Sequence, residues 1–245
     1  MRALLVGLLC VGLSTACGRG CLGGGGLVTG SPTELVTYEV HRAKSAVTVD
    51  GLLAESAWDG AARATLLRSV DGRAITWSTE ARLLWDDEHL YVGFVNEDKN
   101  VSSPFAKDDD PLYTSNVVEI FVNPSGDLQR YFEIEVSPAN KLFDASFVGP
   151  RKGMDLAWSS KTVHGVHVDG TLNDARDQDR GWSAELAIPF AALDGARPKV
   201  GDVWRFNLFR LLQGPGQPNE GQAFSPPMVG DFHAVQRFAR LKFVE

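Results

Sequence analysis

The chain of 245 residues contains little cysteine, and its three cysteines, Cys10, Cys17 and Cys21, all lie close to its beginning. Every residue after Cys21 belongs to a stretch without cysteine. This stretch can form no disulfide and no thiolate metal site, and it offers no cysteine nucleophile. We therefore expect the folded part of the chain to be held together by its hydrophobic core alone.

Basic charge is also scarce. Lys and Arg number 24 against 31 Asp and Glu, which gives a net charge of -7. Binding to nucleic acid needs a basic surface that neutralises phosphates. The sequence therefore predicts no nucleic-acid partner, although a hydrophobic content of 44% is ordinary for a folded protein.

Long hydrophobic runs are absent apart from one near the start. Residues 3–13 form an apolar run with the length of a signal-peptide core, too short to span a bilayer. Small residues then precede Cys17, as in a bacterial lipobox. We expect a signal peptide over 1–16, lipidation of Cys17, and a glycine-rich tether over 17–37. The protein is then exported and anchored by lipid to the outer membrane or cell surface, or secreted if Cys17 is not lipidated.

No later segment shows a sustained helical period. Short apolar runs alternate with polar residues instead, as in Val118-Ile120-Val122 and Phe132-Ile134-Val136, and turn signals such as 123–126 close them. This pattern predicts an all-β, antiparallel, jelly-roll-like β-sandwich that forms a single domain over 38–245. Helical hints are confined to 54–62 and 190–193. The aromatic residues expected in the core are Trp58, Trp85, Phe94, Phe132, Trp182, Trp204 and Phe206.

Catalytic motifs of the common hydrolases and nucleotide-binding enzymes are missing, so carboxylates are the main candidates for chemistry. Alternation predicts that Glu133, Glu135 and Glu185 face solvent. Glu119 differs, because Val117 and Phe121 on its face of the strand are apolar, so its carboxylate either contacts a ligand or is paired structurally. The acidic runs 86–88 and 108–110 could hold calcium, but such runs are more typical of solvated turns. His164 and His167 are expected to be surface residues.

Aromatic residues at turns and loop edges could stack on sugar rings. This group contains Tyr113, Phe224, Trp77, Trp158 and Phe232. The sequence alone identifies these five residues only as candidates for stacking on a sugar.

Short motifs along the chain resemble, in the same order, those of family 9 carbohydrate-binding modules. They are Val49-Asp50-Gly51 with 54–58, Leu84–Val92, Asp110–Tyr113, Val117–Val122, Tyr131–Ile134 with Ser137-Pro138, Gly181–Pro189, Trp204–Asn207, and Phe224-Ser225-Pro226 with Phe232-His233 and Phe238. The resemblance covers about 38–245. It implies a β-sandwich that binds sugars between two aromatic rings, with calcium as a structural ion.

By position, the resemblance places Tyr113 and Phe224 at the two stacking positions and Glu119 at a polar sugar contact. Both rings are smaller than the Trp of the family. Asn116 stands where the motif has Asp, and Phe132-Glu133 stands where an Arg contact is expected. With Trp77 from the shortlist, the candidate ligand-binding residues are Tyr113, Glu119, Phe224, Asn116 and Trp77.

These observations predict a non-catalytic carbohydrate-binding lipoprotein that supports polysaccharide breakdown beside glycoside hydrolases. No cofactor is expected beyond a structural calcium ion. One alternative is a haem-binding redox module, with His233, Met228, Met154 and His89 as candidate axial ligands. Two others are a glycoside hydrolase that uses a pair of strand carboxylates and a scaffold or adhesion domain without a sugar ligand.

Overall fold

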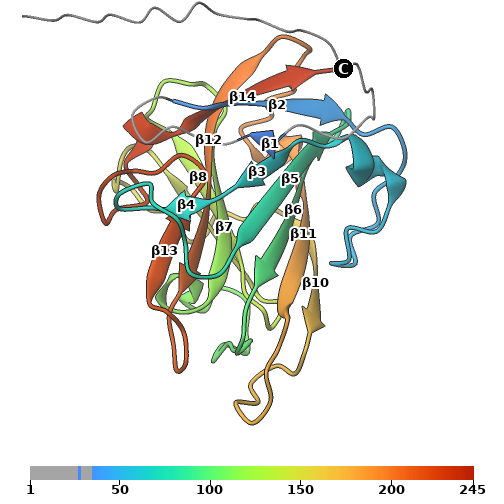
Figure 1. Ribbon diagram of the computed structural model, residues 1–245. Coiled ribbons are helices and arrows are strands. Elements are labelled where there is room, and N and C mark those ends of the chain that lie inside the picture. Colours follow the sequence, from blue (N-terminus) through green and yellow to red (C-terminus); the bar gives the residue numbers. More distant parts are fainter. Residues whose placement is uncertain (1–26, 29–34) are drawn as a thin grey trace, which may run out of the picture.

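The computed structural model describes residues 27–28 and 35–245 (Figure 1). Its main strands are β2 (Thr37–Arg42), β5 (Thr79–Trp85), β6 (His89–Glu97), β7 (Val117–Asn123), β8 (Tyr131–Val136), β9 (Leu142–Phe147), β10 (Val163–Asp169), β11 (Gly181–Pro189), β12 (Val203–Leu212) and β14 (Ala239–Val244). Shorter strands are β1 (Leu27–Val28), β3 (Arg63–Thr65), β4 (Leu67–Arg68) and β13 (Glu220–Ala223). The 3-10 turns are η1 (Ser56–Gly60), η2 (Leu112–Thr114), η3 (Phe190–Ala192) and η4 (Val235–Arg237).

The strands form two antiparallel layers. One layer has the order β10-β11-β6-β5, and the other has the order β12-β7-β8-β9. Strands β2 and β14 join the layers, because β5 pairs with β2, β2 with β14 and β14 with β12. The pairs β5-β2 and β2-β14 are parallel. The predicted all-β sandwich is confirmed, with a mixed seam where its two sheets meet.

The main core lies between the two layers. Leu83, Val92 and Ala184 face it from the first layer, and Ile120 and Phe206 face it from the second. All seven aromatic residues expected in the core are buried: Trp58, Trp85, Phe94, Phe132, Trp182, Trp204 and Phe206. The two helical hints are short 3-10 turns, at Ser56–Gly60 and Phe190–Ala192.

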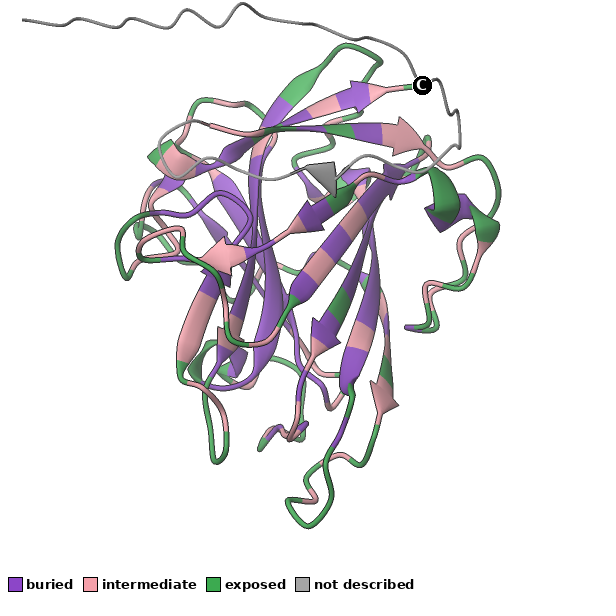
Figure 2. Cartoon of the chain, in the orientation of Figure 1, coloured by how far each residue is buried: buried purple, intermediate pink, exposed green. Residues whose placement is uncertain are grey.

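The second layer is buried on both faces. All residues of β7 and β8 are buried, whereas burial in β5 is interrupted by half-buried positions, as the colouring of Figure 2 shows. A second hydrophobic cluster covers the outer face of β7, β8, β9 and β12, and it includes Leu112, Val235 and Phe238 from outside the strands. The chain therefore folds back over this face, and the candidate site lies there.

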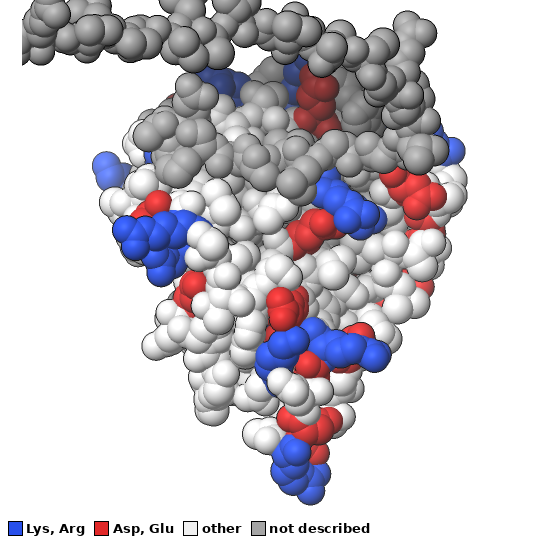
Figure 3. All heavy atoms as spheres, in the orientation of Figure 1, with Lys and Arg blue, Asp and Glu red and all other residues white. Residues whose placement is uncertain are grey.

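The surface carries mixed charge. On the part of the face drawn in colour in Figure 3, blue and red groups lie beside one another with wide uncharged areas between them. Many are ion pairs, such as Arg63 with Glu80 and Arg68 with Asp71. Within the described ranges, no helix is long and apolar enough to cross a membrane.

Candidate functional site

A pocket of about 440 Å³ opens on the outer face of the second layer. Its lining combines aromatic and aliphatic side chains with carboxylates, one arginine and one histidine. The lining residues are Tyr113, Glu119, Phe121, Glu133, Phe147, Arg151, Met154, Leu211, Gly230, Phe232 and His233. They come from β7, β8, β9 and β12, from the turn η2, and from loops at 151–154 and 230–233.

Strand alternation explains which side chains reach this pocket. Val118, Ile120 and Val122 of β7 point into the main core, so Glu119 and Phe121 point to the opposite face. On β8, Phe132 and Ile134 point into the core in the same way. Glu133 and Glu135 therefore project on the side of the pocket.

Three glutamates meet at the floor of the pocket. Glu119 lies directly opposite Glu135 in the β7-β8 ladder, and Glu133 lies one position further along the same face of β8. One carboxylate oxygen from each of the three lies within 4.8 Å of the others. Their exposed fractions are only 2% for Glu119, 4% for Glu133 and 0% for Glu135. We call Glu119, Glu133 and Glu135 the carboxylate cluster.

Burial sets the protonation of this cluster. Loss of hydration raises the pKa of Glu133 to about 7, and it raises the pKa of Glu119 and of Glu135 well above the ordinary value. Mutual repulsion raises the pKa of Glu119 and Glu135 further. Among the described residues, Oε2 of Glu133 and both carboxylate oxygens of Glu135 have no hydrogen-bond partner. Buried acceptors without donors are costly, so the cluster needs a proton or a bound group.

A histidine and an arginine flank the cluster. The Tyr131 hydroxyl accepts a hydrogen bond from the Arg151 backbone N–H at 3.3 Å and lies 2.6 Å from Nδ1 of His233. Nε2 of His233 lies 4.0 Å from Oε2 of Glu133. Burial lowers the pKa of His233 to about 4, so this ring is neutral at pH 7. The Arg151 guanidinium pairs with Asp231 at 2.7 Å.

The aromatic wall of the pocket has an exposed ring and a supported ring. Tyr113 is 45% exposed and packs edge-on against Phe143, with the ring centroids 5.3 Å apart. Phe232 stacks on Phe209 at 4.2 Å, with an interplanar angle of 9°. Tyr113 therefore offers a ring surface to a ligand, and Phe232 is held in place by the sheet beneath it.

The structure brings two of the five predicted ligand-binding residues, Tyr113 and Glu119, to this pocket. The prediction for Phe224 needs correction. Phe224 is 0% exposed and packs in the main core against Tyr38 and Phe206, with ring centroids 6.1 and 5.7 Å away. Phe224 directly follows β13, and its side chain points into the core, so a ligand cannot reach the ring. Phe232, eight residues later in the same loop region, lines the pocket instead.

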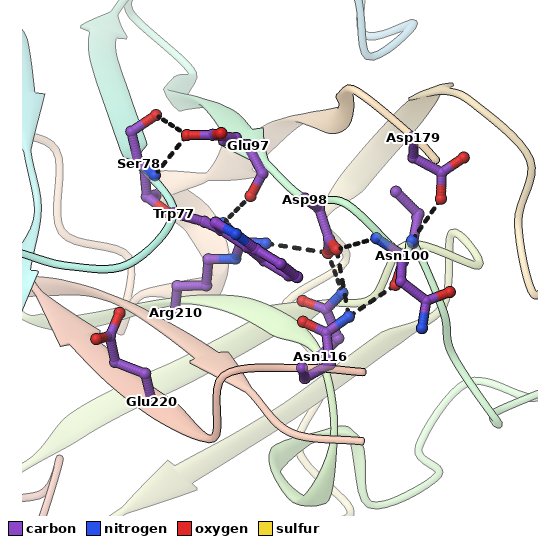
Figure 4. Close-up of polar contacts among 12 residues, drawn as sticks. Trp77, Ser78, Glu97, Asp98, Asn100, Asn116, Asp179, Arg210 and Glu220 are labelled. Atoms are coloured by element: carbon purple, nitrogen blue, oxygen red, sulfur yellow. Dashed lines mark hydrogen bonds and ion pairs between the residues drawn. The ribbon is translucent and has the colours of Figure 1, made fainter. Parts of the chain in front are cut away.

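Asn116 and Trp77 lie away from the pocket, around a different buried group. Nδ2 of Asn116 donates to Oδ2 of Asp98 at 2.6 Å, and the Arg210 guanidinium donates to the same oxygen at 3.1 Å (Figure 4). An aspartate at 116 would set two carboxylates against each other, whereas the amide of Asn116 donates to Asp98. Trp77 lies beside this network and accepts a hydrogen bond from Gln222 through its backbone carbonyl.

The expectation that Glu133, Glu135 and Glu185 face solvent is wrong. Glu133 and Glu135 point away from the core, as alternation predicts, but the second hydrophobic cluster covers that face. Glu185 of β11 is buried under the loop at 50–58. It accepts hydrogen bonds from the Gly51 backbone N–H and from Nε1 of Trp58, both at 2.8 Å. A Cβ at Gly51 would lie 2.6 Å from the His167 backbone nitrogen, so this close approach requires glycine.

The acidic runs form hydrogen bonds within their turns and also to other segments, since Asp87 pairs with Arg42 and Asp108 accepts from the Leu142 backbone N–H. Oδ1 of Asp86 accepts hydrogen bonds from the Glu88 and His89 backbone N–H groups, and Oδ2 of Asp110 accepts from those of Ala106 and Lys107. The bond from Glu88 to Asp86 is an Asx turn. Of the proposed haem ligands, His233 and Met154 line the pocket, whereas His89 and Met228 do not. Cys17 and the predicted signal peptide lie outside the described residues.

Sequence reasoning missed the roles of Glu133, Glu135, Arg151 and His233. A signal for the two glutamates was present, because β7 and β8 carry acids at facing positions of neighbouring strands. Knowing the strand register would have revealed the cluster. Arg151 and His233 sit in loops, and no periodic pattern assigns loop residues to a sheet face.

Comparisons with known proteins agree with this architecture. The model of the carbohydrate family 9 binding domain-like family matches residues 49–211. A relative described as an extracellular protein of Arthroderma benhamiae is 28% identical over 179 residues, which are 68% of this chain and 78% of the relative.

Two solved structures share the fold. A presumed carbohydrate-binding protein of Bacteroides uniformis has a TM-score of 0.70 and 17% identity over 84% of this chain and 98% of its own. A family 9 carbohydrate-binding module of Caldicellulosiruptor kristjanssonii, solved with cellotriose, has a TM-score of 0.62 and 15% identity over 85% of this chain and 93% of its own.

Proposed function

Because the chain belongs to the carbohydrate family 9 binding domain-like family, we propose that its outer-face pocket binds a saccharide. The observation that carries the proposal is the pairing of an exposed ring, Tyr113, with the buried carboxylate of Glu119 in one pocket. Sugars present C–H faces that pack on aromatic rings and hydroxyls that donate to carboxylates. The structurally similar module of Caldicellulosiruptor kristjanssonii binds cellotriose, which supports the same class of ligand here.

In this proposal the Tyr113 ring packs on a sugar face, and Phe232 forms a further part of the aromatic wall. Glu119 accepts hydrogen bonds from hydroxyl groups. The carboxylates of the cluster project from one face of the sheet instead of flanking a cleft from opposite sides, so the geometry supports binding and offers no opposed pair for glycoside cleavage. One stacking ring and a few hydrogen bonds supply only a few kcal/mol net, so we expect a Kd on the order of micromolar to millimolar.

The biological setting is part of the proposal. A signal peptide over 1–16 and lipidation of Cys17 would hold the domain at the outer membrane or cell surface. A tether over 17–37 would let it reach a polysaccharide, and glycoside hydrolases acting on that polysaccharide are the partners we propose. Binding by this domain would then keep the substrate close to the enzymes.

The test is isothermal titration of the purified protein against a panel of soluble saccharides, with affinity gels for polysaccharides. Tyr113→Ala should weaken binding at least tenfold, because it removes the exposed ring surface. Trp77→Ala is the matched control, since it removes an aromatic side chain that does not line the pocket. Equal binding by wild type and Tyr113→Ala would refute the proposed site. A panel without any binding would favour a scaffold role.

A further inference from the structure

The carboxylate cluster gathers more carboxyl groups in the pocket than the cationic groups of the lining can pair. Glu119, Glu133 and Glu135 are buried and mutually close. The one arginine in the lining, Arg151, already pairs with Asp231, and His233 is neutral at pH 7. A neutral sugar brings no charge to correct this imbalance. A cationic group at the floor of the pocket would correct it.

We propose that the pocket selects a saccharide with a free ammonium group, an amino sugar, and that Glu119, Glu133 and Glu135 hold this ammonium. The inference rests on the proposed function and names the sugar class. Glu119 and Glu133 line the pocket and contact the ligand directly. Glu135 is fully buried and does not line the pocket, but one of its oxygens lies within 4.8 Å of an oxygen of each of the other two glutamates.

The geometry of the cluster fits an ammonium group. Charge-assisted N–H···O bonds are about 2.8 Å long, so three oxygens in tetrahedral directions around one nitrogen lie about 4.6 Å apart. The three oxygens of the cluster all lie within 4.8 Å of one another, so a single nitrogen can reach one oxygen of each glutamate. The oxygens that have no partner, on Glu133 and Glu135, then gain the donors that they lack.

The rest of the lining favours an ammonium over a divalent metal ion. Calcium takes six to eight oxygen ligands, and magnesium keeps several waters. Three carboxylates leave much of that shell to waters, which need polar partners of their own. The pocket surrounds the cluster instead with Phe121, Phe147, Leu211 and Phe232. An ammonium uses its three N–H groups on the carboxylates, and the attached sugar carbons pack on these rings.

Binding should also displace protons. The titratable and charged groups around the cluster are Tyr131, Arg151, Asp231 and His233. His233 is already neutral, and Arg151 and Asp231 already form an ion pair, so protons held by the glutamates are the ones an ammonium replaces. A neutral sugar has no such effect.

The experiment compares three β-1,4-linked disaccharides that differ only at carbon 2: the glucosamine dimer, the N-acetylglucosamine dimer and cellobiose. Titration calorimetry of the purified protein with EDTA, in two buffers of different ionisation enthalpy, gives affinity and proton release. We expect the glucosamine dimer to bind at least tenfold more tightly than the other two and to release protons. Glu135→Gln should bring the ratio of its affinity to that of cellobiose close to one. Glu88→Gln, an exposed glutamate outside the pocket, should leave the ratio unchanged.

Each other outcome counts against the inference in a distinguishable way. Cellobiose binding as tightly as the glucosamine dimer overturns the inference and leaves the proposed function intact. Absence of binding by all three disaccharides overturns both. Calcium binding to the protein alone, lost in Glu135→Gln and competing with the glucosamine dimer, would show that the cluster is a metal site. A thermal unfolding curve confirms that each variant is folded.

Discussion

Two groups of buried polar residues lie on opposite faces of the second layer, and they differ in charge balance. The first is the pair of Arg210 and Asp98, whose side chains are both 0% exposed. The second is the carboxylate cluster, with exposed fractions of 4% or less. Arg210 meets an opposite charge, whereas each glutamate of the cluster lies beside two other carboxyl groups.

The two groups also differ in how many of their polar atoms have hydrogen-bond partners. Besides Asp98, the Arg210 guanidinium donates to Oγ1 of Thr79 at 3.1 Å and to the Glu97 carbonyl at 2.8 Å (Figure 4). Asp98 also accepts from Asn116, so most polar atoms of this group are paired within the protein. Such pairing ties β12 to β5 and β6. A buried cluster of carboxyl groups with unpaired oxygens lowers stability instead, and its presence points to a ligand.

The largest expected effect is on the paired group. Asp98→Ala leaves the Arg210 charge buried without its partner, and we expect it to lower the free energy of unfolding by about 3–5 kcal/mol. Urea denaturation measures the change. Asp87→Ala is the matched control, because the Asp87 side chain is 83% exposed in its pair with Arg42 and should contribute under about 1 kcal/mol. Similar losses in the two variants would contradict a structural role for the buried pair.

A buried carboxylate with partners should behave like the first group. Glu185 accepts from two backbone N–H groups and from the Trp58 indole. In Glu185→Gln an amide NH₂ faces these donors, so we expect a loss of about 1–3 kcal/mol in the free energy of unfolding. Glu39→Gln, at an exposed ion pair with Lys242, serves as the control. Stability equal to that of the control would show that the bonds to Glu185 add little.

The same change in the carboxylate cluster should have the smallest effect on stability and the opposite sign. Glu135→Gln replaces a buried carboxyl group directly opposite Glu119 with an amide that carries no charge at any pH, so we expect no loss, or a gain of about 1 kcal/mol or less, at pH 7.5. A loss above about 1 kcal/mol would mean that Glu135 makes stabilising contacts.

The pH dependence of stability gives a second readout of this variant. Between the ordinary glutamate pKa of 4.5 and about 7, the folded protein holds protons on Glu133 that the unfolded chain has released. The free energy of unfolding of the wild type should therefore fall as the pH rises through this window. Glu135→Gln should flatten that fall, because Glu135 also has a raised pKa and the variant removes its own titration. An unchanged slope in urea titrations would contradict the raised pKa values.

The fold could be predicted because alternation and turn signals report locally on each strand, as in 118–122 and 132–136. The unusual position of Glu119 could also be predicted, since the apolar residues Val117 and Phe121 lie two positions before and after it on the same face of the strand. The residues that cover that face could not be predicted, because Val235 and Phe238 lie more than a hundred positions away, in and directly after the 3-10 turn η4. For the same reason Glu133 and Glu135 were predicted to be exposed. Phe224 and Phe232 occupy the same loop region, and only the backbone path decides which ring turns inward.

The seam between the layers has a consequence for biosynthesis. Strand β2 pairs with β5 only through His41 and Arg42, and its long pairing is with β14. Glu39 of β2 and Lys242 of β14 are 203 positions apart. Non-local pairing of this kind forms slowly, so the barrel-like closure waits until β14 has been synthesised. A ribosome releasing this chain, or a translocase carrying it, handles a polypeptide whose strand edges are still open. Protection by chaperones until β14 pairs with β2 should determine what fraction of the newly made protein escapes aggregation.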